Sequence, residues 1–149
     1  MDDIKIALRF VGLYIVSKEM SEMPLDLSLT PVFNFDIRVE SKVQAPRNLI
    51  LSVVHVSISE LNKPLKLANI STACLFEITD FINVVKPNEA GLYVIPEQLE
   101  ALIRPVSIST TRGIIYSEFR GTYLNNAIMP IIFMDTFKPM PIENAELKK

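Results

Sequence analysis

Few side chains in this chain of 149 residues have the chemistry for catalysis or metal binding. His55 is the only histidine and Cys74 the only cysteine. With one residue of each kind, a single chain cannot build a zinc site or a redox pair. His55 lies within an apolar run, where a lone histidine is more often a hydrogen-bonded structural residue than a catalytic base. Cys74 also has apolar neighbours, so we interpret it as a small buried hydrophobe.

The acidic residues and glycines also lack a pattern that is typical of an active site. Glu97 and Glu100 lie three positions apart on a predicted helix. That spacing could support acid–base catalysis, but a solvated helix face is the commoner reason for it. The four glycines form no phosphate-binding loop. We therefore expect no enzymatic activity, no metal and no cofactor.

The charge balance argues against nucleic-acid binding. Fifteen basic and 17 acidic residues give a net charge of −2, and there is no basic run. Tyr116, Phe119 and Tyr123 could stack on bases, but no basic groove accompanies them. We expect no nucleic-acid partner.

The composition is apolar for a protein that does not enter a membrane. Hydrophobic residues make up 49% of the chain, and the mean hydropathy is +0.29. No apolar run approaches the roughly 18 residues that a membrane span needs, and Met1–Lys5 lacks the basic stretch of a signal peptide. We expect a cytoplasmic location without membrane insertion. The apolar excess fits a large core, an oligomer interface or a binding groove, and composition does not separate these.

Alternating apolar residues predict four strands, over residues 4–16, 32–40, 49–58 and 66–82. The apolar phase slips near Gly12, which indicates a bulge in the first strand. Residues 17–31 are predicted to be a loop, and short turns follow at 44–48 and 60–64. Because short connections join the strands, we expect an antiparallel sheet. The third and fourth strands are apolar on both faces, so we expect a partner subunit to cover the face that the helices leave open.

The second half predicts helices. After a loop at 86–91, Pro96 and Glu97 are typical of a helix start. The helix carries an apolar stripe of Leu99, Leu102, Ile103 and Val106. Pro105 is expected to break or kink this helix, and a second helix would then run to Gly121.

The remaining residues predict no further large element. We expect an extended crossing over residues 123–130 and a short helical turn or strand over 131–137. Residues 143–149 are expected to form a solvated tail to a single domain spanning 1–142. The predicted fold class is α+β, with a four-stranded antiparallel sheet followed by helices packed on one face.

Three segments of the C-terminal half stand out as a set. They are Thr111-Arg112-Gly113-Ile114-Ile115, Arg120-Gly121-Thr122-Tyr123 and Met129-Pro130-Ile131-Ile132-Phe133. They resemble the SecB family of export chaperones, with its Ala-Arg-Glu-x-Ile-like helix start, its Arg-Gly-Thr-aromatic helix end and its Pro-Val-Asn-Phe segment. Upstream, Phe76-x-Ile78 is similar to the family's Phe-x-Ile at the end of the sheet. The resemblance covers residues 10–137, and the departures from it include Gly113 in place of an acid.

The resemblance implies an ATP-independent holdase that binds unfolded polypeptides or preproteins, for instance for protein export. It also implies a homotetramer built as a dimer of dimers. The tail from Glu143 lacks the acidic or metal-dependent character with which the family engages the SecA motor, so SecA contact is in question. The alternative is a SecB-like adaptor that serves one partner, such as an antitoxin.

The groove that the resemblance implies would lie between sheet and helices. Our candidate client-binding residues are large and apolar, and each could instead be part of the core. They are Phe76, Ile78, Leu99, Leu102, Ile103, Ile131 and Phe133.

Overall fold

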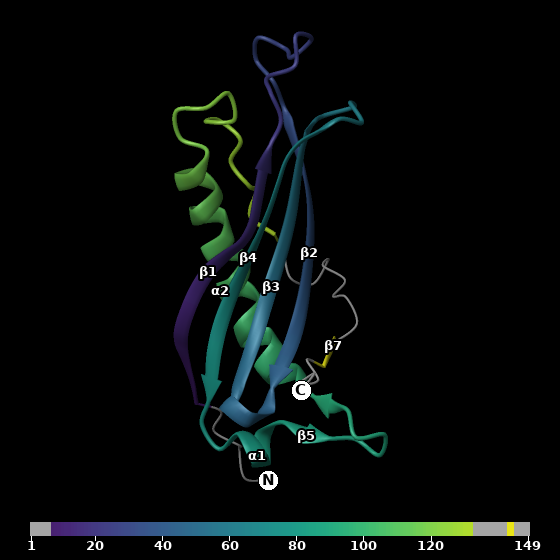
Figure 1. Ribbon diagram of the computed structural model, residues 1–149, viewed down its shortest axis with the longest axis vertical. Coiled ribbons are helices and arrows are strands. Elements are labelled where there is room, and N and C mark those ends of the chain that lie inside the picture. Colours follow the sequence, from purple (N-terminus) through teal and green to yellow (C-terminus); the bar gives the residue numbers. More distant parts are fainter. Residues whose placement is uncertain (1–6, 133–142, 145–149) are drawn as a thin grey trace.

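The computed structural model describes residues 7–132, 143 and 144. Four long strands form an antiparallel sheet, which one long helix, α2 (Glu97–Glu118), crosses on one face (Figure 1). The strands are β1 (Leu8–Met20), β2 (Phe33–Gln44), β3 (Leu49–Glu60) and β4 (Lys66–Ile78). Their order in the sheet is β1-β4-β3-β2, and β7 (Glu143–Asn144) continues the sheet in parallel beside β2. The predicted sheet with helical cover on one face is confirmed.

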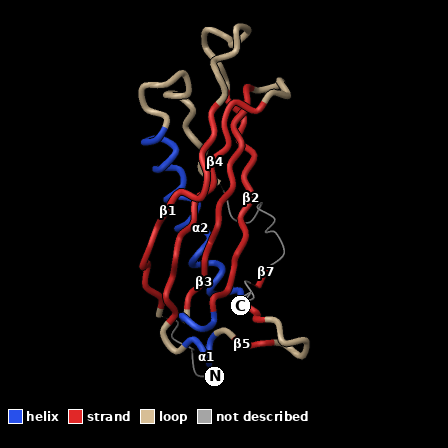
Figure 2. The backbone as a smooth tube through the Cα atoms, viewed as in Figure 1, coloured by secondary structure: helices blue, strands red, loops and turns tan. Residues whose placement is uncertain are grey.

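The short elements gather at one end of the sheet, as Figure 2 shows. They are the 3₁₀ helix η1 (Ala45–Arg47), the helix α1 (Phe81–Val84) and a hairpin of β5 (Lys86–Pro87) and β6 (Tyr93–Val94). The β1–β2 and β3–β4 connections lie together at the opposite end. The backbone amide of Leu61 donates to the carbonyl of Val32 at 2.8 Å, which ties these two connections together.

Several predicted boundaries were wrong. β1 continues to Met20, so the β1–β2 loop begins later than predicted, and β3 continues to Glu60. β4 ends at Ile78 rather than at 82, because the chain turns at Asp80 and forms α1. Asp80 has a φ of 57°, in the left-handed region, where aspartate is among the better tolerated residues. The apolar residues after Ile78 form a helical turn. They were predicted as part of the strand because a short apolar run does not distinguish a strand from a helical turn.

The predicted irregularity near Gly12 is confirmed. The pairing of β1 with β4 shifts register between Phe10 and Gly12, and again between Ile15 and Ser17. Each shift inserts an extra residue and changes the face on which the following side chains lie. This accounts for the change of apolar phase in the sequence.

α2 is one continuous helix, so Pro105 does not break it and the predicted second helix is the latter part of α2. The alternative of a kink at Pro105 stays a prediction. Proline cannot donate a hydrogen bond to the carbonyl four residues earlier, here that of Ala101. Ala101 is exposed, so water can bind the carbonyl that Pro105 leaves free. Ile103, Ser107 and Ile108 are buried on both sides of the proline, and their packing holds the helix together.

The core lies between α2 and the sheet and has two parts. Near the start of α2, Leu99 and Ile103 pack with Ile50 and Phe76 of the sheet in one cluster. Near its end, Ile115 and Phe119 pack in a second cluster with Val54, Val56, Ile58 and Ile70. Between the clusters, the hydroxyl groups of Thr72 and Thr111 lie 2.7 Å apart, and both residues are buried. The helix is therefore fixed to the sheet by apolar packing, by this polar contact at its middle and by an ion pair between Lys18 of β1 and Glu118 at its end, 2.8 Å apart.

The chain after α2 runs back along the helix. Gly121 adopts a φ of 77° just past the helix end, as expected for a residue that stops a helix. Residues 123–126 form turns rather than the predicted extended crossing, and 127–132 are irregular. Arg112 of α2 donates hydrogen bonds to the carbonyls of Met129 at 3.0 Å and Pro130 at 2.9 Å, which fasten this segment to the helix.

Part of the predicted C-terminal structure lies outside the described residues. Residues 131 and 132 belong to no helix or strand, and 133–137 are not among the residues that the structure describes. Glu143 and Asn144, predicted to begin a solvated tail, pair with Lys42 and Val43 of β2 instead. The division into a domain of residues 1–142 and a tail of 143–149 otherwise stays a prediction.

Candidate functional site

Four of the seven predicted client-binding residues are core residues in this structure. Phe76, Ile78, Leu99 and Ile103 are each at most 2% exposed and belong to one cluster between the sheet and α2. The structure therefore brings them together, as predicted, but in the alternative role of core packing. A client could contact them only after α2 moved off the sheet.

The other predicted residues are placed differently. Leu102 lies on the outer side of α2 and is 48% exposed, while Ile131 is 76% exposed in the segment after the helix. Phe133 lies outside the described residues. Leu102 and Ile131 are thus available for contact with another molecule, and their predicted role stays a prediction.

An apolar groove lies at the other end of the sheet, beneath the β1–β2 loop. It has a volume of about 410 Å³ and is formed by the loop residues Met23 to Pro31 on one side and by Phe33, Tyr123 and Asn126 on the other. Its walls are mainly leucine, methionine, proline and aromatic side chains, together with the polar side chains of Ser28 and Asn126. Such a groove can accept apolar side chains of another chain, which makes it our candidate functional site.

The loop above this groove exposes its leucines. Leu25 and Leu29 are fully exposed, and Met23 is 58% exposed. Leu27 differs, since it is partly buried and packs against the second core cluster. Fully exposed leucines cost free energy in water and commonly mark surfaces that bind another molecule.

Tyr123 joins the loop to the segment after α2. Its hydroxyl donates to the carbonyl of Ser21 at 2.9 Å and lies 3.1 Å from the hydroxyl of Ser21. The amide of Ser21 in turn donates to the carbonyl of Leu67 on β4 at 2.8 Å. The first residue of the loop is therefore held by both the sheet and the segment after the helix.

A charged cluster joins the middle of the loop to the β3–β4 turn. Lys63 Nζ lies 2.9 Å from Glu60 Oε2 and donates to the carbonyl oxygen of Asp26 at 2.6 Å. Glu60 Oε1 accepts a hydrogen bond from the amide of Ser28 at 3.3 Å. Hydrogen bonds from Ser28 and Lys63 lower the pKa of the Glu60 carboxyl below its usual 4.5, and the hydrogen bond with Glu60 raises the pKa of Lys63 above 10.5. Both groups are therefore charged at neutral pH.

Two further apolar surfaces are exposed. The first is β1, the edge strand, on which Phe10, Leu13, Tyr14 and Val16 are all exposed. The second lies along the outer side of α2 and consists of Leu102, Val106, Ser109, Gly113 and Tyr116, which we call the α2 stripe. Its members are spaced 4-3-4-3 along the helix, the spacing of residues that pack against another helix.

The residues with reactive side chains are structural. His55 Nδ1 lies 2.7 Å from the hydroxyl of Ser71, so the histidine is satisfied as predicted, although β3 is a central strand and not an edge. Cys74 is fully buried, and burial raises the pKa of its thiol, which confirms its interpretation as a small hydrophobe. The solvated face predicted for Glu100 was wrong, because this residue is buried and pairs with Arg104 at 2.9 Å.

The described residues hold neither a metal-binding cluster nor a membrane-spanning helix. Among residues 7–132, 143 and 144, no group of three or more histidine, cysteine or acidic residues is placed to hold a metal ion. Within the same residues, no helix is both long enough and apolar enough to cross a membrane.

The groove residues were missed because they lie in a segment that was predicted only as a loop. Leu25, Leu27 and Leu29 alternate with polar residues between Pro24 and Pro31. Alternating leucines in a loop are unusual, since loops are normally polar, and this pattern could have identified the site. The contribution of Tyr123 could not be seen in the same way, because about 100 residues separate it from the loop.

Comparison with known proteins identifies the fold. No protein-family model and no curated protein matches the sequence. Among solved structures, the chain is similar to the Mycobacterium tuberculosis SecB-like chaperone Rv1957 in complex with a ChAD peptide from the Rv1956 HigA1 antitoxin. The match has a TM-score of 0.57 and 11% sequence identity, and it covers 84% of this chain and 90% of the other. The chain thus has the SecB-like fold that the sequence predicted.

Proposed function

We propose that this protein is a non-enzymatic, cytoplasmic chaperone that holds unfolded polypeptide segments without using ATP. The observation that carries the proposal is the apolar groove of about 410 Å³ beneath a loop with fully exposed leucines. A surface of this kind is unfavourable in water and favourable against an extended apolar segment.

The structural neighbour supports a polypeptide as the ligand. The SecB-like protein of Mycobacterium tuberculosis was solved with a bound peptide from an antitoxin. We extend that property to this chain because the two share a fold and because the groove here is lined by apolar side chains. The same observation favours a second candidate function, that of an adaptor dedicated to one partner protein.

The volume of the groove determines how much of a client one groove can bind and how tightly. A volume of about 410 Å³ holds only a few side chains, so one groove covers a short stretch of a client. Binding must offset the conformational entropy that the client loses, and a few apolar contacts offset it only in part. We therefore expect weak binding at each groove and tight binding when several grooves engage one chain.

We propose a homo-oligomer, in line with the tetramer that the resemblance implies. The α2 stripe and the exposed side chains of β1 are two separate apolar surfaces on each subunit. Gly113 lies within the α2 stripe, next to Ser109 at its centre, and a Cβ added at Gly113 would meet no heavy atom within 4 Å. Small residues at this point allow a second helix to approach closely. An oligomer would bring several grooves together, as tight client binding requires.

The first experiment measures light scattering from a slowly folding, aggregation-prone protein without nucleotide. We expect scattering to fall as this protein is added and the effect to saturate at a few subunits per client. Leu25→Ser combined with Leu29→Ser should weaken the effect, because both leucines are fully exposed and their replacement leaves the core unchanged. The matched control is Leu92→Ser, an exposed leucine in the β5–β6 connection, outside the described groove lining. No suppression at large excess would contradict a general holdase.

A pull-down separates the two candidate functions. One stoichiometric partner would support the dedicated adaptor, whereas many clients without fixed stoichiometry would support the holdase. Preproteins among those clients would support a role in export, and co-purification of SecA would support delivery to it.

A further inference from the structure

The wall of the groove is a loop and not a helix or strand. Most of the residues that line the groove belong to the β1–β2 connection between Met20 and Phe33. A loop of this length has many alternative conformations, and the groove exists only in those that keep the loop near Phe33 and Tyr123. Something must therefore hold the middle of the loop in place.

Of the loop residues, Leu27 is the one that packs against a described core cluster, and Pro24 and Pro31 are only partly buried. Leu25 and Leu29, on either side of Leu27, are fully exposed. The hydrogen bonds of Tyr123 reach Ser21, at the first residue of the loop. The described contacts that remain for the middle of the loop, besides its internal bond from Leu27 to Pro24, are those made by Glu60 and Lys63.

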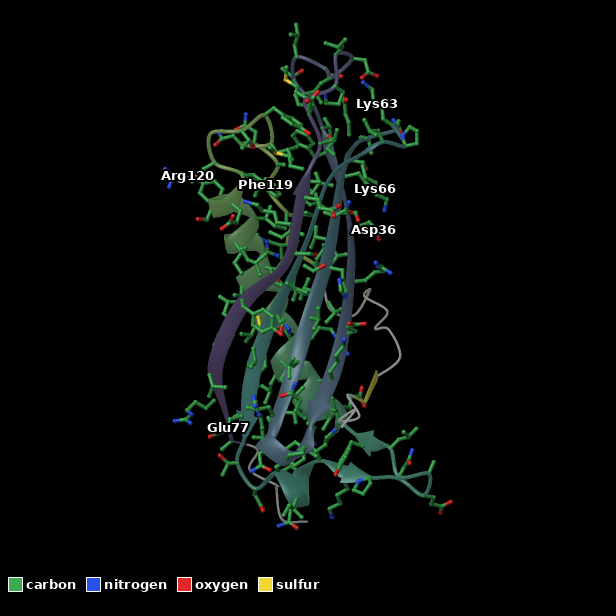
Figure 3. The ribbon with its side chains drawn as sticks, viewed as in Figure 1. Asp36, Lys63, Lys66, Glu77, Phe119 and Arg120 are labelled. Atoms are coloured by element: carbon green, nitrogen blue, oxygen red, sulfur yellow. The ribbon has the colours of Figure 1, made fainter. Side chains whose placement is uncertain are left out.

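Glu60 and Lys63 are well placed to hold the middle of the β1–β2 loop. Glu60 is the last residue of β3, and its side chain is 8% exposed, so its position is fixed by the sheet. One carboxylate oxygen accepts the amide of Ser28, and the other binds Lys63. Lys63 then reaches the carbonyl of Asp26. The loop backbone is thus held at two points, two residues apart, by a charged pair on the β3–β4 side; Figure 3 shows Lys63 at the end of the molecule where this loop lies.

We propose that Glu60 and Lys63 act as a clamp that positions the β1–β2 loop and thereby forms the groove. Both are positioning residues, since neither needs to touch a client. The inference rests on the proposed function for the meaning of the groove, but the clamp itself concerns only the loop. It implies that two charged residues control binding to an apolar surface.

The first test measures the loop directly by amide hydrogen exchange in the full chain. Lys63→Met removes the hydrogen bond to the carbonyl of Asp26, and Glu60→Gln removes the negative charge that Ser28 and Lys63 bind. Each should speed exchange at Ser28 and Leu27 by roughly tenfold, the effect of weakening a hydrogen bond to a charged group. The matched control is Lys66→Met. Lys66 is exposed, is labelled with Lys63 in Figure 3, and makes no ion pair within the part of the chain that the structure describes. Unchanged exchange in both clamp variants would overturn the proposal.

The second test measures the groove with Nile red, a neutral dye that fluoresces in apolar surroundings. We expect the clamp variants to weaken dye binding by about three- to tenfold, as for the loss of one supporting contact, while Lys66→Met leaves it unchanged. Faster exchange without any change in dye binding would overturn the claim that the clamp forms the groove. If both readouts change as expected but the wild-type protein fails to suppress aggregation, the proposed function fails and the clamp stands.

Discussion

Among single residues, the threonine pair beneath α2 shows how a buried polar contact is satisfied. Thr111 Oγ1 donates to the carbonyl of Ser107 at 2.7 Å, so the hydroxyl of Thr72, 2.7 Å away, must donate to Thr111. Each hydroxyl therefore depends on the other or on the helix backbone. Because both residues are fully buried, neither hydroxyl can bond to bulk water instead.

The contact between Thr72 and Thr111 allows a prediction about the free energy of unfolding. Thr72→Val should lower the free energy of unfolding by about 1–2 kcal/mol, because it leaves an acceptor on Thr111 unused. Thr111→Val should cost more, since it strands the buried hydroxyl of Thr72. The double variant should cost less than the sum of the two. Urea denaturation measures all three, and strictly additive losses would contradict the assigned bond.

Single residues also show that the sequence could not predict which apolar side chains are buried. The alternation of apolar residues that predicted a strand over residues 32–40 matches the structure, in which Phe33, Phe35 and Ile37 are partly buried and Asn34 and Asp36 are exposed. It could not tell a buried apolar residue from an exposed one, because burial depends on what covers the face. For this reason Phe76 and Leu99 were predicted as client contacts although both are buried, whereas the exposed Leu25 and Leu29 were not singled out.

Among the secondary-structure elements, α2 is continuous even though it contains Pro105, a residue type that usually ends a helix. A proline inside a helix removes one hydrogen bond and crowds the preceding turn, at a cost of roughly 3 kcal/mol. The helix is continuous nonetheless, because seven of its residues are buried along its length. Sequence rules based on single residues could predict the local cost, but not the tertiary packing that exceeds it.

Replacing this proline should therefore stabilise the protein. We expect Pro105→Ala to raise the free energy of unfolding by about 1–3 kcal/mol, since the amide can then donate to Ala101 and alanine favours helix. This gain in stability is smaller than the local cost of the proline, because proline also lowers the conformational entropy of the unfolded chain. Chemical denaturation measures the change. A loss of stability would show that the proline ring packs in a way that alanine cannot replace.

At the scale of the whole molecule, the sequence predicted the sheet and its class well. Four alternating segments with short connections leave few arrangements other than an antiparallel sheet, and one apolar helix must then cover one face. The boundaries at Met20, Ile78 and Glu118 depended on turns and packing that a single sequence does not show. The surfaces that the fold leaves exposed, on β1 and α2, become visible only once the core is known.

The exposed α2 stripe gives a prediction about assembly. Gly113→Leu should stabilise a lone subunit by about 1 kcal/mol, because leucine favours helix far more than glycine does and the site is open. If a second α2 packs there, the same change should weaken the oligomer. Sedimentation over a range of concentrations measures this, with Ala101→Leu, exposed but outside the stripe, as the control. Equal masses for both variants at every concentration would contradict assembly through this helix.

The pairing of β1 with β4 has a consequence for the protein during its own synthesis. Leu8 pairs with Ile78 and Met20 with Ala68, so each residue of the first strand meets its partner only after 48 to 70 further residues have been made. At roughly 5–20 residues per second, several seconds pass in which an apolar strand and an apolar loop leave the ribosome without a partner. During that interval the nascent chain has the character of the clients that we propose it binds. Copies that are already folded could then protect those still being translated.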